Sequence, residues 1–243
     1  MKMPKNGRKW ADVKTEMLDR GGNDVKWREG RTAVYVFNAG EEIAKIQKEA
    51  YTAYMSENGL GPVAFPSLAK MEADVISMAL NLLHGPAGST GAMTSGGTDS
   101  ITMAIKTARD YARADGRALE RANIVIPQSA HLAFDKACQL MDIEVRRIAL
   151  KSDETFEADV DAMEAACDPS TIMMVGSAPN FPHGVIDPIT ALGSVAERNN
   201  IWLHVDACVG GYFAPFARMN GVPVPAFDFE VPAVQSMSAD LHK

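Results

Sequence analysis

The sequence lacks the features of a secreted or membrane-spanning protein. It has only three cysteines in 243 residues, Cys138, Cys167 and Cys208, and no CxxC pair. An odd number without paired spacing indicates neither a disulfide framework nor a metal site. No apolar run approaches the roughly 18 residues that cross a bilayer, and no apolar stretch follows the basic start. We therefore expect a soluble, cytoplasmic protein without a membrane anchor.

An excess of basic charge is missing too. The formal net charge is -7 and the sequence pI is about 5.3. A protein that grips nucleic-acid phosphates needs a basic face, so we expect no nucleic-acid partner. Hydrophobic residues make up 47% and charged residues 23%, the balance of a globular protein with a core. Any anionic ligand must then be held by local geometry.

The hydrophobic pattern changes near residue 60. Residues 1–60 are more polar and contain one helical pattern, at 41–57. A second helix is predicted at 68–83, with Ser67 as its N-cap. We expect a helical N-terminal segment, 1–60, followed by a large domain, 61–243.

Short apolar runs alternate with helical patterns in the large domain. The predicted strands are 123–127, 144–149, 171–176, 201–207 and 233–237. The predicted helices are 98–114, 133–141, 158–166 and 189–199. This alternation indicates an α/β fold with a mostly parallel sheet sandwiched by helices. Ligands of such sheets bind at the carboxyl ends of the strands.

A glycine-rich loop, 94–100, precedes the first helix of this series. It matches neither GxxxxGK[ST] nor GxGxxG. Gly96 and Gly97 let the backbone approach a ligand closely, and the free N–H groups of a first helical turn attract anions. The loop is either a phosphate cup without a lysine or an ordinary capped loop.

Three more polar residues follow predicted strands. His131 could stack on a flat ring or cap a helix. A buried Asp206 needs a cationic or strong donor partner, and His204, on the same strand face, could orient it. Lys243 could be a desolvated, nucleophilic amine or a solvated side chain. Each residue alone has an ordinary explanation.

Together these signals favour one ligand. Phosphate cup, ring-stacking histidine, buried aspartate and lysine match the phosphate, ring face, ring nitrogen and aldehyde of pyridoxal 5′-phosphate (PLP). The sequence stops at Lys243, directly after a strand pattern. We therefore expect a piece of a longer chain, with the C-terminal part of the fold missing.

The same motifs carry a resemblance to a known family. They are Thr-Ser-Gly-Gly-Thr-Asp-Ser at 94–100, Ser-Ala-His at 129–131, His-Val-Asp-Ala-Cys at 204–208 and Ser-Ala-Asp-Leu-His-Lys at 238–243. The chain resembles the group II PLP-dependent decarboxylases and, within them, the sphingosine-1-phosphate lyases. The resemblance implies the fold type I of PLP-dependent transferases. It also implies a homodimer with shared active sites, in which 1–60 contributes to the substrate entrance and the dimer.

The resemblance assigns roles to individual residues. Lys243 would form the Schiff base with PLP, Asp206 would pair with the pyridinium nitrogen, and His131 would stack on the ring. Tyr35 would lie near the substrate as a fourth catalytic residue. The other implied cofactor-binding residues are Ser95, Gly96, Gly97, Thr98, His204, Ser238 and His242.

The implied reaction is retro-aldol Cα–Cβ cleavage of a phosphorylated long-chain amino alcohol to a fatty aldehyde and phosphoethanolamine. The family's histidine just before the Phe-Pro pair is absent here, where Ala64 precedes Phe65. An amino-acid decarboxylase and a PLP-binding protein without turnover stay open as alternatives.

Overall fold

The structure, a computed structural model, describes residues 2–32, 35–61, 63–117 and 120–243. Its contacts divide the chain into two units, Met1–Ser56 and Glu57–Lys243. The division lies near the predicted change of pattern at residue 60. None of the helices in the described ranges is long and apolar enough to cross a membrane.

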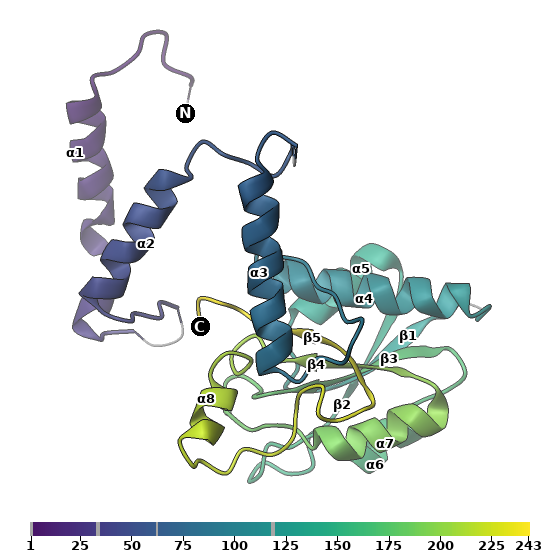
Figure 1. The fold of residues 1–243 in the computed structure, drawn as a ribbon. Helices are drawn as coiled ribbons and strands as arrows, with labels where there is room; N and C mark the ends of the chain where they lie inside the picture. The colour runs from purple at the N-terminus through teal and green to yellow at the C-terminus, as the bar shows by residue number, and fades with distance from the viewer. Residues whose placement is uncertain (1, 33–34, 62, 118–119) are drawn as a thin grey trace. The chain divides into compact units, whose positions relative to one another are not determined.

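The first unit is helical (Figure 1). It contains α1 (Trp10–Arg20), the 3-10 turns η1 (Gly21–Asn23) and η2 (Trp27–Glu29), and α2 (Glu41–Ala53). Sequence patterns predicted α2 but not α1, which is polar along most of its length. No residue of either helix is buried. The apolar residues of these helices therefore have no core of their own.

The second unit is built around a five-stranded parallel sheet with the strand order β2-β1-β3-β4-β5. The strands are β1 (Asn123–Pro127), β2 (Glu144–Ile148), β3 (Thr171–Ser177), β4 (Trp202–Asp206) and β5 (Val234–Ser238). All five predicted strands are present, each within one residue of its predicted bounds. The α/β fold with a parallel sheet is confirmed.

Helices cover both faces of the sheet (Figure 1). On one face lie α4 (Gly97–Ala114) and α5 (Ala133–Met141), and on the other α6 (Val160–Ala165) and α7 (Ile189–Asn199). Side chains alternate across the strands, so Ile124 and Ile126 pack with α4 and α5 while Val125 packs with α7. This alternation gives two hydrophobic cores, one on each side of the sheet.

The helix α2 ends four residues before its predicted end and α6 begins two residues after its predicted start, and two further helices differ from the sequence prediction. The helix expected from residue 68 is α3 (Pro66–Leu82), with Pro66 in its first turn and Phe65 as N-cap. Ser67 is therefore not the N-cap. Proline fits the first helical position because its φ is already helical and it has no N–H group that would need an acceptor. The short helix α8 (Ala214–Met219) was not predicted, since six residues give too little periodicity.

Candidate active site

The glycine-rich loop forms a turn that leaves two backbone donors free. Gly96 has φ 145°, which favours glycine, and α4 begins at the next residue. The N–H groups of Gly97 and Thr98 donate to no acceptor in the described chain, whereas those of Asp99 and Ser100 donate to the Gly96 carbonyl. The start of α4 therefore offers two N–H donors and the positive end of a helix dipole to an anion.

Ser95, also expected in the phosphate cup, forms hydrogen bonds within the loop and the first turn of α4. Ser95 donates its N–H and its hydroxyl to Asp99 Oδ2, at 3.1 and 3.2 Å. This pairing fixes the loop in front of α4. It also means that the Ser95 hydroxyl must exchange its partner before it can bind a ligand.

Close packing joins the start of α4 to the loops that follow β4 and β5. A Cβ atom on Gly97 would lie 2.9 Å from Cys208 Sγ and 3.2 Å from both carboxylate oxygens of Asp240. Real Cβ atoms are not found that close to a sulfur atom. Position 97 thus requires glycine, and the anion-binding turn lies beside Asp240.

Asp206 ends β4 as a buried carboxylate with one oxygen engaged. Its Oδ1 accepts hydrogen bonds from Cys208 N–H at 3.1 Å and from the Ser238 hydroxyl at 3.3 Å. Its Oδ2 accepts no N–H or O–H hydrogen bond within the described ranges, although the Cys208 thiol also interacts with the carboxylate, and the residue is only 7% exposed. The free oxygen is suited to one cationic N–H donor from outside the protein core.

His204 lies beneath Asp206 and is completely buried. Its Nδ1 lies 2.9 Å from Ser236 Oγ and its Nε2 lies 3.3 Å from Ser238 Oγ. Burial lowers the pKa of His204 to about 4, so the ring is neutral at pH 7. Because the ring is buried and both of its nitrogens have partners, it is connected to Asp206 through Ser238. The expectation that His204 binds a cofactor stays a prediction.

Lys243 is held by an acidic residue that sequence patterns did not single out. Its Nζ lies 2.8 Å from Asp240 Oδ2, and the Asp240 side chain is 5% exposed. His242 Nε2 lies 3.9 Å from the same oxygen and is largely exposed. The spacing of three residues between Asp240 and Lys243 was the available signal. The Asp240 carboxylate thus links the amine to the start of α4.

His131 has one of the two roles considered for it, that of a helix cap. Its Nδ1 accepts the N–H of Ala133 at 3.1 Å at the start of α5, so the proton of the neutral ring lies on Nε2. The residue is exposed, which leaves the imidazole accessible to a flat ligand. Its stacking role stays a prediction.

Tyr35 belongs to the other unit, where it is 87% exposed. Its catalytic role also stays a prediction.

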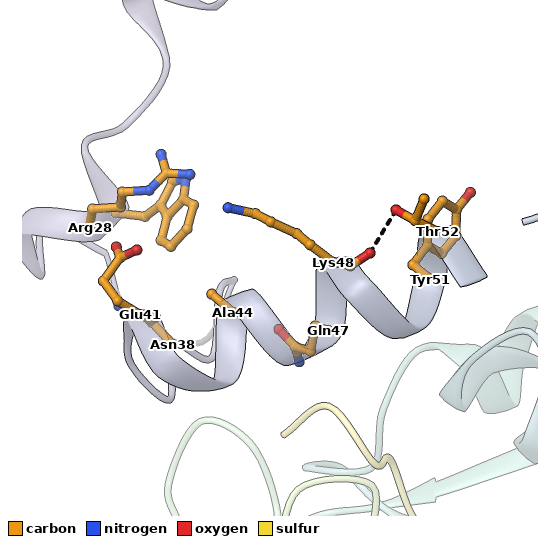
Figure 2. Close-up of a pocket in the computed structure, with 9 residues that line it drawn as sticks. Arg28, Asn38, Glu41, Ala44, Gln47, Lys48, Tyr51 and Thr52 are labelled. Carbon is orange, nitrogen blue, oxygen red and sulfur yellow. Dashed lines mark hydrogen bonds between the residues drawn. The ribbon is translucent and has the colours of Figure 1, made fainter. Parts of the chain in front are cut away.

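A separate hollow of about 420 Å³ lies in the first unit (Figure 2). Arg28 and Lys48 extend into it from η2 and α2, and the Arg28 guanidinium lies 4.1 Å from the centre of the Trp27 ring. None of the predicted site residues is among the described residues that line it. The hollow is therefore distinct from the site at the strand ends.

The chain matches a family model described as the pyridoxal-dependent decarboxylase conserved domain over residues 3–243. It belongs to this family. A rice sphingosine-1-phosphate lyase (Oryza sativa subsp. japonica) is 45% identical over 229 residues, 90% of this chain and 42% of that protein. A probable L-tyrosine/L-aspartate decarboxylase of Methanocella arvoryzae is 41% identical over 199 residues, 82% and 50% of the two chains.

A solved structure shares the whole fold. The sphingosine-1-phosphate lyase of Burkholderia pseudomallei superposes with a TM-score of 0.93 at 37% identity, covering 100% of this chain and 57% of that chain. The expected PLP-dependent enzyme fold is thus confirmed. The chain spans less than half of the rice lyase to which it is similar.

PLP is the cofactor of this family, and the residues present fit it. The unpaired N–H groups of Gly97 and Thr98 suit its phosphate, and the unpaired Oδ2 of Asp206 suits its pyridinium N–H. Lys243 offers a primary amine at the edge of the same sheet.

Proposed function

We propose that the protein is a PLP-dependent lyase that cleaves the Cα–Cβ bond of a phosphorylated long-chain amino alcohol of the sphingosine-1-phosphate type. The products are a fatty aldehyde and phosphoethanolamine. The observation that carries the proposal is the pair of free acceptor and donor sites, Asp206 Oδ2 and the α4 N–H groups, beside Lys243. The similarity to sphingosine-1-phosphate lyases supports the substrate class.

When bound, PLP withdraws electrons from the Cα atom of an attached amine. Asp206 assists by keeping the pyridine nitrogen protonated, since opposite charges 4 Å apart attract by about 4 kcal/mol at an effective dielectric constant near 20. The start of α4 binds the phosphate. Lys243 would supply the amine that holds the cofactor.

Cleavage requires a proton to leave the β-hydroxyl oxygen as the Cα–Cβ bond breaks. The electrons of that bond flow toward Cα, the former Cβ becomes the aldehyde carbonyl carbon, and Cα later takes up a proton. Asp240 keeps the Lys243 amine within hydrogen-bonding distance at 2.8 Å. The lysine amine, once free, is thereby positioned to carry a proton at the edge of the sheet.

The test is product analysis by mass spectrometry on the full-length protein with PLP and phosphorylated sphinganine. We expect a long-chain aldehyde and phosphoethanolamine in equal amounts, and no product from Lys243→Ala. Lys136→Ala, an exposed lysine on α5, is the matched control and should cleave normally. Bound cofactor without cleavage by the wild-type protein would contradict the proposed reaction.

A second candidate is an amino-acid decarboxylase, in which the Cα–carboxylate bond breaks instead. The archaeal decarboxylase at 41% identity favours it. Release of carbon dioxide from an α-amino acid, with no cleavage of phosphorylated sphinganine, would select this reaction. Bound cofactor with neither product would select a PLP-binding protein without turnover.

We also propose that two chains pair. None of the described residues of 2–32 and 35–56 is buried, and large apolar side chains of the first unit are exposed, among them Trp10, Leu18 and Tyr51. Such faces need a covering surface. A second copy supplies one, and we propose that 1–60 contributes to both the dimer and the substrate entrance.

The proposed location is the cytoplasm. Cys138, Cys167 and Cys208 are all free, which suits a reducing compartment. Fractionation of cells followed by detection of the full-length protein tests this. Recovery in the membrane fraction would contradict it.

A further inference from the structure

A line of polar side chains crosses one face of the sheet beneath the candidate site. Trp202, His204 and Asp206 lie two residues apart on β4, and Ser236 and Ser238 lie two apart on β5. The register pairs His204 with Ser236 and Asp206 with Ser238. Residues two apart in a strand share a face, so all five point to the same side of the sheet.

The opposite side of these strands is apolar. Leu203 and Val205 join the core that contains α7. On the polar side, the Trp202 ring meets the edge of Tyr111 from α4 at 5.3 Å, and His204 meets Phe134 from α5 at 6.0 Å between ring centres. The polar line is therefore enclosed between the sheet and two helices, where unpaired donors and acceptors are costly.

Hydrogen bonds connect the five residues in order. Trp202 Nε1 donates to Ser236 Oγ at 2.7 Å, and Ser236 Oγ lies 2.9 Å from His204 Nδ1. His204 Nε2 lies 3.3 Å from Ser238 Oγ, and the Ser238 hydroxyl donates to Asp206 Oδ1 at 3.3 Å. The line thus begins at an indole and ends at the carboxylate.

The chemistry of the two ends favours one arrangement of the protons between them, which competes with a ring N–H directed at the backbone of Ser236. An indole N–H only donates, and a carboxylate only accepts. Trp202 Nε1–H donates a hydrogen bond to Ser236 Oγ, and in this arrangement the Ser236 hydroxyl donates its own hydrogen bond to His204 Nδ1. His204, which is neutral, then carries its proton on Nε2 and donates to Ser238, and Ser238 donates to Asp206. This is the assignment in which every contact holds one proton.

We propose that Ser236 and Trp202 are positioning residues that set the tautomer of His204 and thereby keep the Ser238 hydroxyl pointed at Asp206 Oδ1. The free Oδ2 is then held in one orientation for a ring nitrogen. The consequence for a cofactor rests on the proposed function, but the tautomer is a property of the protein alone. Neither residue touches the ligand site.

Ser236→Ala removes the hydroxyl that connects the indole to the imidazole. Nδ1 loses its donor, and the ring is free to carry its proton on Nδ1 instead. Nε2 then accepts the Ser238 proton, which is withdrawn from Asp206. We expect the Nε2–H form to lose its dominance and the PLP affinity of the cofactor-free protein to fall about ten-fold.

The test reads the ¹⁵N chemical shifts of the histidine ring nitrogens in the cofactor-free, full-length protein labelled with ¹⁵N-histidine. Loss of a resonance in His204→Gln identifies the signal. We expect Nε2–H in the wild type, a shift toward Nδ1–H in Ser236→Ala and in Trp202→Phe, and recovery of Nε2–H in Ser236→Thr, which keeps a hydroxyl.

Gln235→Ala is the matched control, because Gln235 is an exposed neighbour on the same strand. It should leave the tautomer and the PLP affinity unchanged. An unchanged Nε2–H signal in folded Ser236→Ala, or an Nδ1–H wild type, would overturn the proposal. Neither result depends on product formation, so the inference can fail while the proposed lyase reaction stands, and the reverse.

Discussion

At the scale of single residues, Gly97 has the most demanding position in the candidate site. Its missing side chain makes room for Cys208 Sγ and the Asp240 carboxylate, and its N–H is one of the two free donors. The same residue therefore serves packing and is the proposed donor to an anion. A side chain of any size must displace one of these neighbours.

Gly97→Ala tests this double role. The added Cβ would lie 2.9 Å from Cys208 Sγ, so the start of α4 or the neighbouring loops must move by several tenths of an ångström. We expect the affinity for PLP to fall about ten-fold, as for the loss of one or two hydrogen bonds to a charged group. Absorbance titration of the cofactor-free, full-length protein measures it.

Gly59→Ala is the control for this substitution, because nothing lies within 4 Å of the added atom and the backbone is not in the left-handed region. Its affinity for PLP should equal that of the wild type. An unchanged affinity in Gly97→Ala would show that the turn at the start of α4 does not hold the phosphate.

The buried carboxyl group of Asp187 should make the free energy of unfolding depend on pH. Its carboxylate accepts Ser177 N–H at 2.7 Å and Ala158 N–H at 3.2 Å, yet burial outweighs these bonds and raises its pKa to about 6. Between pH 4 and pH 6 the unfolded chain loses this proton and the folded chain keeps it. The free energy of unfolding should therefore fall by about 3 kcal/mol as pH rises through this window.

Urea unfolding at several pH values measures the effect as a difference between variants. Asp187→Asn does not ionise, so its stability relative to the wild type should rise from pH 4 to pH 6. Asp153→Asn, at an exposed position, should follow the wild-type curve throughout. Parallel curves for all three proteins would mean that folding does not raise the pKa of Asp187.

Sequence patterns identified the residues at the strand ends but not their partners. Asp206 and Lys243 follow strands, which is visible in one dimension. The pairing of His204 with Ser236 depends on the register of β4 and β5, which includes an irregularity between Leu203 and His204. No local pattern reports that register, so the sequence alone did not show that His204 contacts Ser236 and Ser238.

At the scale of elements, α4 connects the site to the core. Its first turn carries the free donors, and its residues Ile101, Ala104, Ile105, Ala108 and Ala112 recur at helical spacing and are buried. The same helix therefore anchors the anion-binding turn against the sheet. A substitution that loosens the packing of α4 against the sheet should therefore also displace the turn at its start.

Ile105→Ala tests the anchoring. Ile105 is completely buried, and truncation of a buried isoleucine typically costs about 2–5 kcal/mol because a cavity remains. We expect a loss of unfolding free energy in this range by urea denaturation. Met103→Ala on the same helix is 47% exposed and should cost much less. Equal losses would mean that α4 is not packed as described.

Elements with strong periodicity were predicted well, and those with weak periodicity were not. The buried strands and α4, α5 and α7 have long apolar faces, so their bounds agree with the predictions within one residue. The helices α1 and α8 lack such faces and were missed. The start of α3 was misplaced because Pro66 and Ser67 are both good starting residues, and only the structure decides between them.

At the scale of the whole molecule, the first unit is the part that needs a partner surface. Its helices α1 and α2 have 11 and 13 residues, lengths at which isolated helices are marginal in water. Neither contains a buried residue. Stability must come from burying their apolar faces against a surface that these helices do not supply.

Assembly of the full-length protein tests this reasoning. We expect analytical ultracentrifugation to show a dimer, and we expect deletion of residues 1–56 to shift the equilibrium toward monomer by at least ten-fold in dissociation constant, because the exposed side chains of Trp10, Leu18 and Tyr51 are lost. A shorter deletion, 1–6, removes residues that precede α1, of which 2–6 are exposed, and should leave the dimer intact. A full-length protein that is monomeric at micromolar concentration would contradict the pairing, and a dimer unaffected by removal of 1–56 would place the interface in the second unit.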